Sequence, residues 1–244
     1  MTDDLTRDAL LGGRITYAQP RRGYRVGHEA PMLASFALLP DTRPPRRVLD
    51  LGAGAGAVGL CLARALVAAR VTLVEREPLA ARLAAENARD NGWADRVEAL
   101  TVDVAHAAEA LPRGGFDLVV SNPPWFELSR GTAPDEPRRR AARMIGPGVA
   151  RAFVLAARHA LGRGGRVCLA VPSQSLTTWL DELSRAGLVA KRLRLIHPRV
   201  EEPANVALVD ARAGRTGGLI VEPPLAVRRC ADYTDEARRI LWGE

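Results

Sequence analysis

Residues 48–59 read Val-Leu-Asp-Leu-Gly-Ala-Gly-Ala-Gly-Ala-Val-Gly, an apolar run that ends in alternating glycines. Residues 116–125 read Phe-Asp-Leu-Val-Val-Ser-Asn-Pro-Pro-Trp, a second strand-like run with a polar turn directly behind it. In an open parallel sheet, ligands bind at the carboxyl ends of the strands, near the point where the strand order reverses. We therefore expect both turns to face one crevice, the first suited to an adenosine-type cofactor and the second to a flat amine.

From about residue 46 onward, strand-like runs alternate with helical patterns, which is typical of a parallel α/β sheet. The pattern predicts a doubly wound, mostly parallel, seven-stranded, Rossmann-like sheet. The predicted strands are residues 48–51, 71–74, 97–101, 118–121, 166–171, 189–198 and 205–213, with a further extended segment at 219–222. The predicted helices are residues 58–68, 79–91, 150–161 and 175–186.

The first 45 residues follow a different pattern, and we expect a hairpin and helix extension that covers the site. Residues 13–19 and 24–26 are predicted to pair around a turn at residues 20–23, which contain proline and glycine. A short helix is predicted over residues 31–39.

The remaining residues, 46–244, are predicted to form the catalytic domain. Within it, residues 126–148 are polar and rich in proline, glycine and charge. Long loops in compact domains are usually functional or disordered, so we interpret this stretch as an inserted substrate loop.

The overall composition favours a globular protein with an anionic partner. The 244-residue chain has a net charge of +7 and a pI of about 10.3, which suggests nucleic acid as that partner. The three cysteines lie far apart without CxxC spacing, so neither a metal site nor a disulfide framework is expected. A cytoplasmic setting is predicted, because we find no signal-peptide pattern and no apolar run long enough to span a membrane.

The glycine segment suits a nucleotide-type ligand, since glycine permits positive φ and close approach to the backbone. Residues 54–59 also satisfy GxGxxG, which keeps a nicotinamide or flavin site open. Asp50 is poorly placed for a pyrophosphate and well placed for a cationic ligand. Glu75 ends the next strand, the expected position of an acid that holds ribose hydroxyls. Asp103 follows the third strand and suits either an adenine amino group or a helix N-cap.

The Asn-Pro-Pro-Trp turn suits a poorly nucleophilic planar amine, whose lone pair must be turned toward the methyl donor. The Asn122 side-chain oxygen and the Pro123 carbonyl supply two acceptors for its N–H groups. Proline has a fixed φ and no competing N–H, and Pro124 restricts Pro123 to an extended geometry. Trp125 offers a face on which a base can stack.

Residues 48–56 resemble the first motif of class I S-adenosyl-L-methionine-dependent methyltransferases. The resemblance implies that Asp50, Gly52 and Gly54 line the methionine and ribose side of the cofactor. It also implies that Glu75 binds the ribose diol and Asp103 faces the adenine. The implied cofactor-binding set is Asp50, Gly52, Ala53, Gly54, Glu75, Arg76, Asp103, Val104 and Asn122.

The turn itself resembles the signature of methyltransferases that act on planar nitrogens. Its flanks, including residues 19–25, 27–33, 195–198 and 233–236, resemble the bacterial adenine-N6 methyltransferases of a valine tRNA. That resemblance implies methylation of adenine N6 in RNA, with tRNA near the anticodon favoured over other structured RNA. The implied catalytic residues are Asn122, Pro123, Pro124 and Trp125.

Arginines beside aromatic residues near the N-terminus suit single-stranded RNA. The predicted substrate-binding residues are Arg21, Arg22, Arg25 and Trp125. His28 and Glu29 are further candidates, although a hydrogen-bonded loop histidine is the favoured interpretation of His28.

Four other functions stay open at this point. Two are methyltransferases, one acting on a glutamine of a protein and one on guanine N2 of rRNA. The arginine-rich hairpin speaks against the glutamine enzyme. A non-catalytic RNA-binding module is disfavoured by the intact Asn122 turn, and a nicotinamide oxidoreductase is disfavoured by Asp50.

Overall fold

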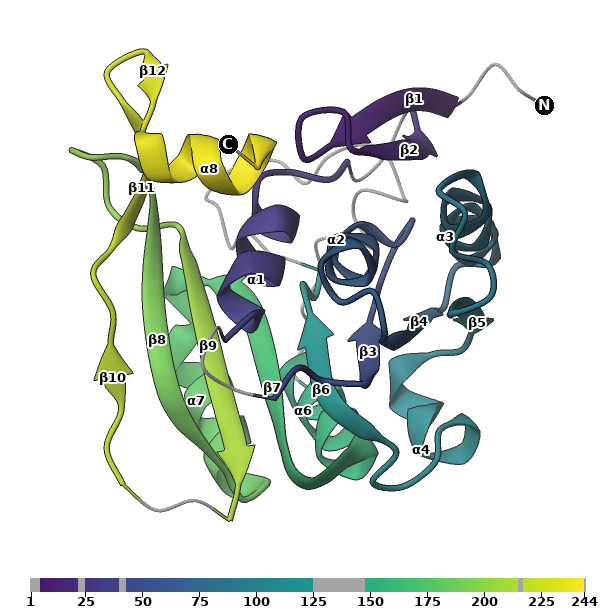
Figure 1. The fold of residues 1–244 in the computed structure, drawn as a ribbon. Coiled ribbons are helices and arrows are strands. Elements are labelled where there is room, and N and C mark those ends of the chain that lie inside the picture. The colour runs from purple at the N-terminus through teal and green to yellow at the C-terminus, as the bar shows by residue number, and fades with distance from the viewer. Residues whose placement is uncertain (1–4, 22–24, 40–42, 125–147, 215–216, 244) are drawn as a thin grey trace, which may run out of the picture.

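The computed structural model describes residues 5–21, 25–39, 43–124, 148–214 and 217–243 of the chain. A single large sheet runs through it (Figure 1). Its strands are β3 (Arg47–Leu51), β4 (Arg70–Glu75), β5 (Val97–Thr101), β6 (Phe116–Ser121), β7 (Leu161–Pro172), β8 (Leu188–Arg199), β9 (Val206–Ala213), β10 (Ile220–Val221), β11 (Leu225–Arg229) and β12 (Asp232–Tyr233).

The strand order is β12-β11-β8-β9-β7-β6-β3-β4-β5, and β10 pairs with β8 beside β11. The chain runs from β3 outward to β4 and β5 and then returns to β6 on the other side of β3, so the order reverses between β3 and β6. Among the described strands of this sheet, only β9 and β12 run antiparallel to their neighbours. The predicted α/β class and mostly parallel sheet are therefore confirmed.

The sheet has ten strands where seven are predicted. The additional strands β10, β11 and β12 all lie between residues 220 and 233. β10 falls within the extended segment predicted at residues 219–222, whereas β11 and β12 are not predicted. β12 contains only two residues, which is too short for an alternating pattern to be seen in the sequence. The three strands extend the sheet beyond β8.

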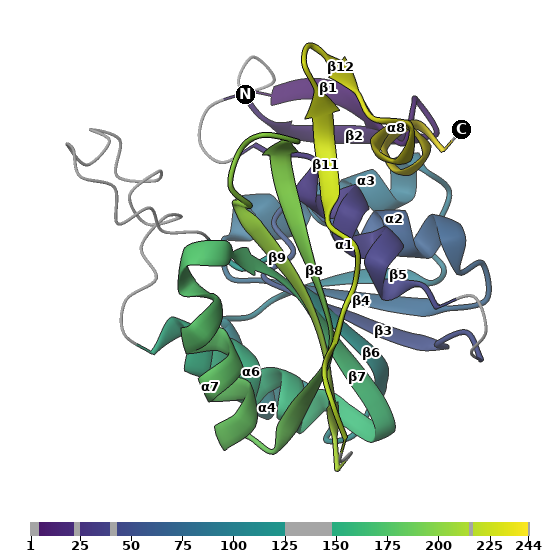
Figure 2. The same ribbon diagram turned by 90° about the vertical axis from the view of Figure 1, so that its left-hand side faces the viewer.

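Helices cover both faces of the sheet, as Figure 2 shows. The helical segments are α1 (Glu29–Ala37), α2 (Ala57–Ala65), α3 (Pro78–Asp90), η1 (Val104–His106), α4 (Ala107–Ala110), α6 (Val149–Ala160), η2 (Ser173–Ser175), α7 (Leu176–Arg185) and α8 (Asp235–Trp242). Among the described residues, no helix is both long and apolar enough to cross a membrane.

Two apolar cores result, one on each face of the sheet. Alternate residues of a strand point to opposite faces, so Val48 joins the core under α1, α2 and α3, whereas Leu49 joins the core under α4, α6 and α7. Because both faces are buried, the inner strands are almost wholly apolar, as expected for a covered parallel sheet. Asp50 is therefore an exception that calls for a specific role.

The N-terminal hairpin is formed by β1 (Leu5–Leu10) and β2 (Ile15–Pro20), so the predicted pairing of residues 13–19 with residues 24–26 is wrong. The chain turns at residues 11–14, where Leu11, Gly12 and Gly13 all have positive φ. Glycine adopts this conformation without strain. At the other end of β2, Pro20 has no backbone N–H to donate and ends the pairing. The predicted helix at 31–39 is α1, which begins two residues earlier.

A charged cluster fixes α1 to the sheet. Asp210 on β9 is fully buried, and its Oδ2 atom lies 3.0 Å from Arg166 Nη1 and 3.7 Å from Arg192 Nη1. The two guanidinium groups also donate to the last carbonyls of α1, Arg166 to Ala37 and Arg192 to Phe36. The cluster thus satisfies helix-end carbonyls that would otherwise be buried without a partner.

We expect Asp210→Ala to destabilise the protein by about 3–5 kcal/mol, because it leaves the buried guanidinium group of Arg166 without its counter-ion. The free energy of unfolding, measured by urea titration, checks this. Asp181→Ala removes a solvent-exposed ion pair with Arg185 and is the matched control, with an expected loss below about 1 kcal/mol. Equal effects of the two substitutions would show that the cluster does not hold α1.

Candidate active site

The glycine loop between β3 and α2 has the backbone conformation that its sequence requires. Gly52, Gly54 and Gly56 have φ values of 70°, 57° and 93°. Two N–H groups of the loop, those of Gly52 and Ala53, donate to the carbonyl of Val74 at 2.8 and 3.0 Å. The loop is therefore held against the end of β4.

The glycines differ in the space around them. A Cβ atom added to Gly54 would meet no described residue within 4 Å, whereas one on Gly59 would overlap the side chain of Leu73. Gly59 thus allows α2 to pack closely on β4, and Gly54 leaves the upper side of the loop open to a ligand.

Asp50 lies beneath this loop and is only 1% exposed. Its Oδ2 atom accepts a hydrogen bond from the Gly59 N–H at 2.8 Å, and its Oδ1 atom is buried with no hydrogen-bond partner among the described residues. Burial raises the pKa of Asp50 to about 7, against the lowering effect of the Gly59 hydrogen bond. An unpaired buried carboxylate oxygen is costly, so a cationic partner would stabilise its ionised form.

Glu75 and Asp103 lie at the ends of β4 and β5 and both bind backbone N–H groups. Glu75 accepts from Gly54 at 2.9 Å through Oε2 and from Glu77 at 2.9 Å through Oε1. Asp103 is exposed and caps η1 by accepting from Ala105 at 2.9 Å. The N-cap alternative for Asp103 is thus observed. Arg76 beside Glu75 is exposed, and Val104 is buried.

The Asn-Pro-Pro turn follows β6, which pairs in parallel with β3. The Ser121 hydroxyl donates to the Leu51 carbonyl at 2.7 Å, so the last residues of the two strands are joined directly. Asn122 is half-buried and Pro123 is buried. The turn and the glycine loop therefore leave the same edge of the sheet on neighbouring strands. Trp125 and residues 126–147 of the predicted substrate loop lie outside the described residues.

The N-terminal hairpin is coupled to the glycine loop through Asn87, a fully buried residue of α3. Its amide exchanges hydrogen bonds with Ala18 on β2 and also donates to the Ala55 carbonyl at 3.0 Å. Asn91 exchanges hydrogen bonds with Thr16 in the same way. Sequence reasoning missed this connection, although two asparagines four residues apart on one helix were an available signal.

The predicted substrate-binding arginines already have partners within the chain. Arg25 forms an ion pair with Asp8 at 2.8 Å, and Arg21 donates to the Leu5 carbonyl at 3.4 Å. Arg14 donates to the last carbonyls of α8, those of Trp242 and Gly243. Arg22 lies outside the described residues. These contacts stabilise the hairpin, and RNA binding by the same residues stays a prediction.

No three His, Cys, Asp or Glu side chains in the described part of the chain lie close enough together to hold a metal ion. This edge of the sheet instead offers the glycine loop, the buried carboxylate of Asp50, the acidic side chains of Glu75 and Asp103, and the turn that contains Asn122.

Comparison with known proteins identifies the relatives of this chain. The methyltransferase small domain family matches residues 33–184. The tRNA1(Val) (adenine(37)-N6)-methyltransferase of Yersinia pestis (strain Pestoides F) is 31% identical over 236 residues, which cover 94% of this chain and 92% of the relative. The enzyme of the same name from Enterobacter sp. (strain 638) is 32% identical over 178 residues, which cover 72% of this chain and 70% of the relative.

A solved structure agrees with this assignment. The crystal structure of a predicted O-methyltransferase from Agrobacterium tumefaciens superposes with a TM-score of 0.69 and 28% sequence identity. The superposition covers 86% of this chain and 94% of the other.

The raised pKa of Asp50 has a consequence for stability. The carboxyl group of Asp50 has a higher pKa in the folded state than its ordinary value of 3.8, which applies to the unfolded state. Its contribution to the free energy of unfolding is therefore fully present below pH 3.8 and is lost as the pH rises toward about 7. We expect Asp50→Asn, which cannot ionise, to remove this loss. The ligand-free variant should be more stable than the original protein at pH 8, by up to about 4 kcal/mol, and similar to it at pH 4.

Urea unfolding between pH 4 and pH 8 measures this difference. Asp95→Asn, which changes an exposed carboxylate, is the control and should leave the pH profile unchanged. A profile of Asp50→Asn that runs parallel to that of the original protein would contradict the raised pKa.

Proposed function

Because the chain belongs to the methyltransferase small domain family, we propose that it transfers a methyl group from S-adenosylmethionine to the N6 amine of an adenine in tRNA. The relatives from Yersinia and Enterobacter are named for adenine 37 of tRNA1(Val), and the same nucleotide, beside the anticodon, is proposed here. The predicted cytoplasmic location goes with this proposal and stays a prediction.

The observation that carries the proposal is the parallel pairing of β3 with β6. It brings the glycine loop and the Asn122 turn to one edge of the sheet, with Ser121 hydrogen-bonded to the end of β3. Methyl transfer needs donor and acceptor side by side, and holding two reactants in this way supplies much of the rate enhancement of such reactions.

The residues present fit the proposed donor. The space above Gly54 is open, the orphaned Oδ1 atom of Asp50 suits a cationic group, and Glu75 ends the strand where ribose hydroxyls are held. Asp50, Gly52, Gly54 and Glu75 would hold S-adenosylmethionine. The donor supplies a methyl group on a positively charged sulfur, which leaves as a neutral thioether.

The acceptor is oriented by the Asn122 turn. The side-chain oxygen of Asn122 and the carbonyl of Pro123 accept the two N–H groups of the adenine amine, which turns its lone pair toward the methyl group. Pro123 is buried, so its carbonyl is held by the surrounding chain. Because the leaving group is good, no strong general base is required, and the proton of the methylated amine passes to solvent.

An RNA acceptor accords with the charge of the protein. A net charge of +7 favours a polyanion through release of its counterions. The alternatives kept from the sequence, guanine N2 of rRNA and a protein glutamine, use the same planar-nitrogen chemistry and therefore need a direct test.

The test offers labelled S-adenosylmethionine together with tRNA, rRNA and protein acceptors from a strain that lacks this gene. We expect label in tRNA only, recovered as N6-methyladenosine by nucleoside mass spectrometry. Label in rRNA as N2-methylguanosine, or in protein, would assign the enzyme to one of the alternatives. Label on a ribose hydroxyl would contradict the planar-nitrogen chemistry.

We expect Asn122→Ala to lower the single-turnover rate about a hundredfold or more while the affinity for S-adenosylhomocysteine stays nearly unchanged. Asn122 orients the acceptor, so its hydrogen bond contributes mainly in the transition state. Gln174→Ala, which removes an exposed amide beyond β7, is the control and should retain the full rate. An Asn122→Ala variant with most of the original rate would rule out the orienting role.

A further inference from the structure

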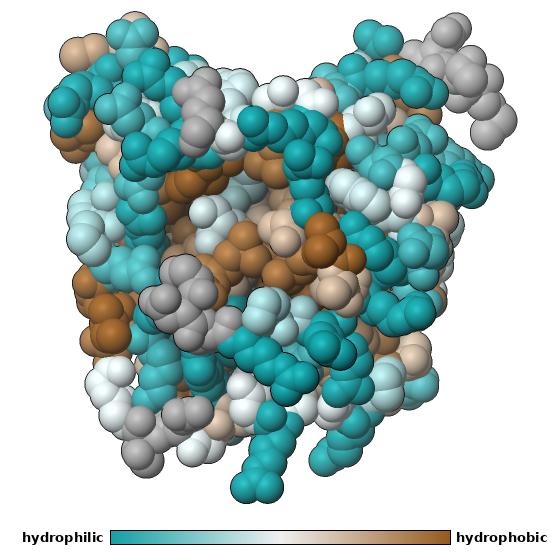
Figure 3. Space-filling model, viewed as in Figure 1, coloured by the Kyte–Doolittle hydropathy of each residue, from teal (hydrophilic) through white to brown (hydrophobic). Residues whose placement is uncertain are grey.

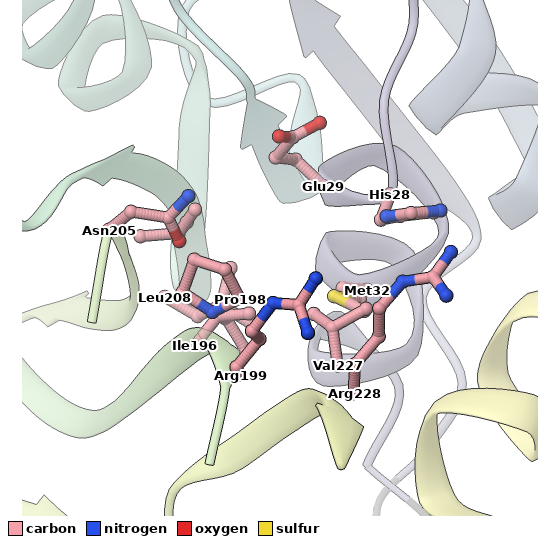
Figure 4. A pocket seen from close by; sticks show the side chains of 11 residues that line it. His28, Glu29, Met32, Ile196, Pro198, Arg199, Asn205, Leu208, Val227 and Arg228 are labelled. Atoms are coloured by element: carbon pink, nitrogen blue, oxygen red, sulfur yellow. The ribbon is translucent and has the colours of Figure 1, made fainter. Parts of the chain in front are cut away.

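A cavity of about 300 Å³ lies between α1, the carboxyl ends of β8 and β11, and the amino end of the antiparallel strand β9. Figure 4 shows it from close by, with side chains from these elements pointing into one space. None of the residues proposed above to hold the methyl donor or to orient the acceptor amine lines it. The face that carries α1 is hollowed beneath α8, and apolar residues show within the hollow (Figure 3).

The cavity lies at the same edge of the sheet as the Asn122 turn. Ser121 pairs with Leu169, so Asn122 stands at the level of Ala170, which pairs with Leu208 of the cavity lining. The paired residues Val206 and Ile196, also in the lining, stand two positions further along the strands. Neighbouring strands are about 4.8 Å apart, which places β9 about 10 Å and β8 about 14 Å from β6.

The cavity also lies on the same face of the sheet as the Asn122 side chain. Leu118 and Val120 belong to the core under α1, and the alternation along β6 gives Asn122 that side. Val206 and Leu208, which line the cavity, belong to the same core. A strand of RNA with its target base at Asn122 can therefore reach the cavity without crossing the sheet.

The lining combines an apolar floor with cations at the rim. Met32, Leu208 and Val227 are at least nine-tenths buried and form part of the floor. Arg199 and Arg228 stand on paired positions of β8 and β11 and are the two cations of the lining. A flat apolar surface beside two guanidinium groups matches the base and the phosphate of a nucleotide.

The two arginines keep donors for a ligand. Arg199 donates to the Cys230 carbonyl at 2.7 Å and lies 3.2 Å from Glu202, and Arg228 donates to the Ala231 carbonyl at 2.6 Å. A guanidinium group has five N–H donors. These contacts therefore position each group and leave several of its N–H donors available to a ligand.

The two arginines differ in their charged neighbours: Arg199 forms an ion pair with Glu202, whereas Arg228 forms none within the described residues. Arg228 also stacks on the Tyr233 ring at 3.9 Å, which fixes its plane. The Tyr233 hydroxyl lies 3.1 Å from His28 Nε2, and burial, with a contribution from Arg228, holds the pKa of His28 below its usual value. Burial therefore disfavours the charged form of the His28 ring. Glu29 is the one carboxylate of the lining, against two arginines.

We propose that this cavity binds one unpaired nucleotide of the RNA acceptor, adjacent to the methylated adenosine, with its phosphate between Arg199 and Arg228. The inference rests on the proposed RNA substrate. It adds a second subsite, which selects RNA in which the nucleotide next to the target adenosine is unpaired. The base lies on the floor formed by Met32, Leu208 and Val227, and Asn205 at the rim faces its edge.

The test measures the affinity of the full chain for RNA at several salt concentrations. The RNA is the unmodified anticodon stem-loop of the tRNA that the enzyme methylates. We expect Arg199→Gln/Arg228→Gln to weaken RNA binding about tenfold and to reduce the salt slope by about 0.7, as expected for one lost phosphate contact on a single strand. Arg163→Gln/Arg185→Gln removes the same charge from the opposite edge of the sheet and is the matched control, with little change in affinity expected.

A second variant tests the base position without changing charge. Asn205→Trp places a large side chain at the rim of the cavity, and Asn205 is exposed, so the fold should tolerate it. We expect weaker RNA binding with an unchanged salt slope, because the base is blocked and no phosphate contact is lost. Affinity for S-adenosylhomocysteine should stay unchanged in all variants, which verifies that they are folded.

The outcomes separate this inference from the proposed function. If tRNA is methylated but both cavity variants bind RNA like the original protein, the nucleotide subsite is wrong and the proposed function stands. If the labelled methyl group goes to protein instead, the proposed function fails. In that case, a loss of peptide affinity in the same cavity variants would assign the cavity to an acidic peptide and overturn the nucleotide subsite.

Discussion

The parallel pairing of β3 with β6 is the constraint on which the rest of this structure depends. It places the reversal of strand order between these strands, so that two turns about seventy residues apart leave one edge of the sheet together. The Ser121 hydroxyl joins the strand ends directly. Asp50 stands in the same strand pair, buried and with one oxygen unpaired. An apolar residue at this position would make the core more favourable, so the carboxylate is best explained by the ligand that the loop receives.

The elements around this edge are connected by polar contacts rather than by apolar packing alone. Asn87 joins the N-terminal hairpin to the glycine loop, and the Arg166–Asp210–Arg192 cluster fixes the end of α1. The other end of α1 contributes Met32 to the cavity at β8 and β9. Because α1 is fixed to the sheet at one end and lines the cavity at the other, its position sets the width of the space beside the Asn122 turn.

Much of the fold was predictable from the sequence, because the inner strands and helices are long and strongly periodic. The turn of the hairpin was misplaced because Gly12-Gly13 and Pro20 are both turn signals, and only pairing partners decide between them. β12 contains only two residues and is too short to leave a pattern, whereas β10 lies within the predicted extended segment at 219–222. At the site, the glycine loop and the Asn122 turn were placed at the correct edge by motif, and membership of a methyltransferase family is confirmed. The Asp210 cluster and the cavity could not be predicted, since their residues come from strands that only the fold brings together.

The central claim is that the glycine loop and the Asn122 turn form one site for a methyl donor and a planar amine. A crystal structure of the protein with S-adenosylhomocysteine tests it most directly. We expect the ligand to lie over Gly54 with its ribose hydroxyls at Glu75. Its sulfur should face the Asn122 side chain, and the gap between the two should accommodate one methyl group and one amine. A ligand bound elsewhere on the protein, or one whose sulfur points away from Asn122, would contradict the claim.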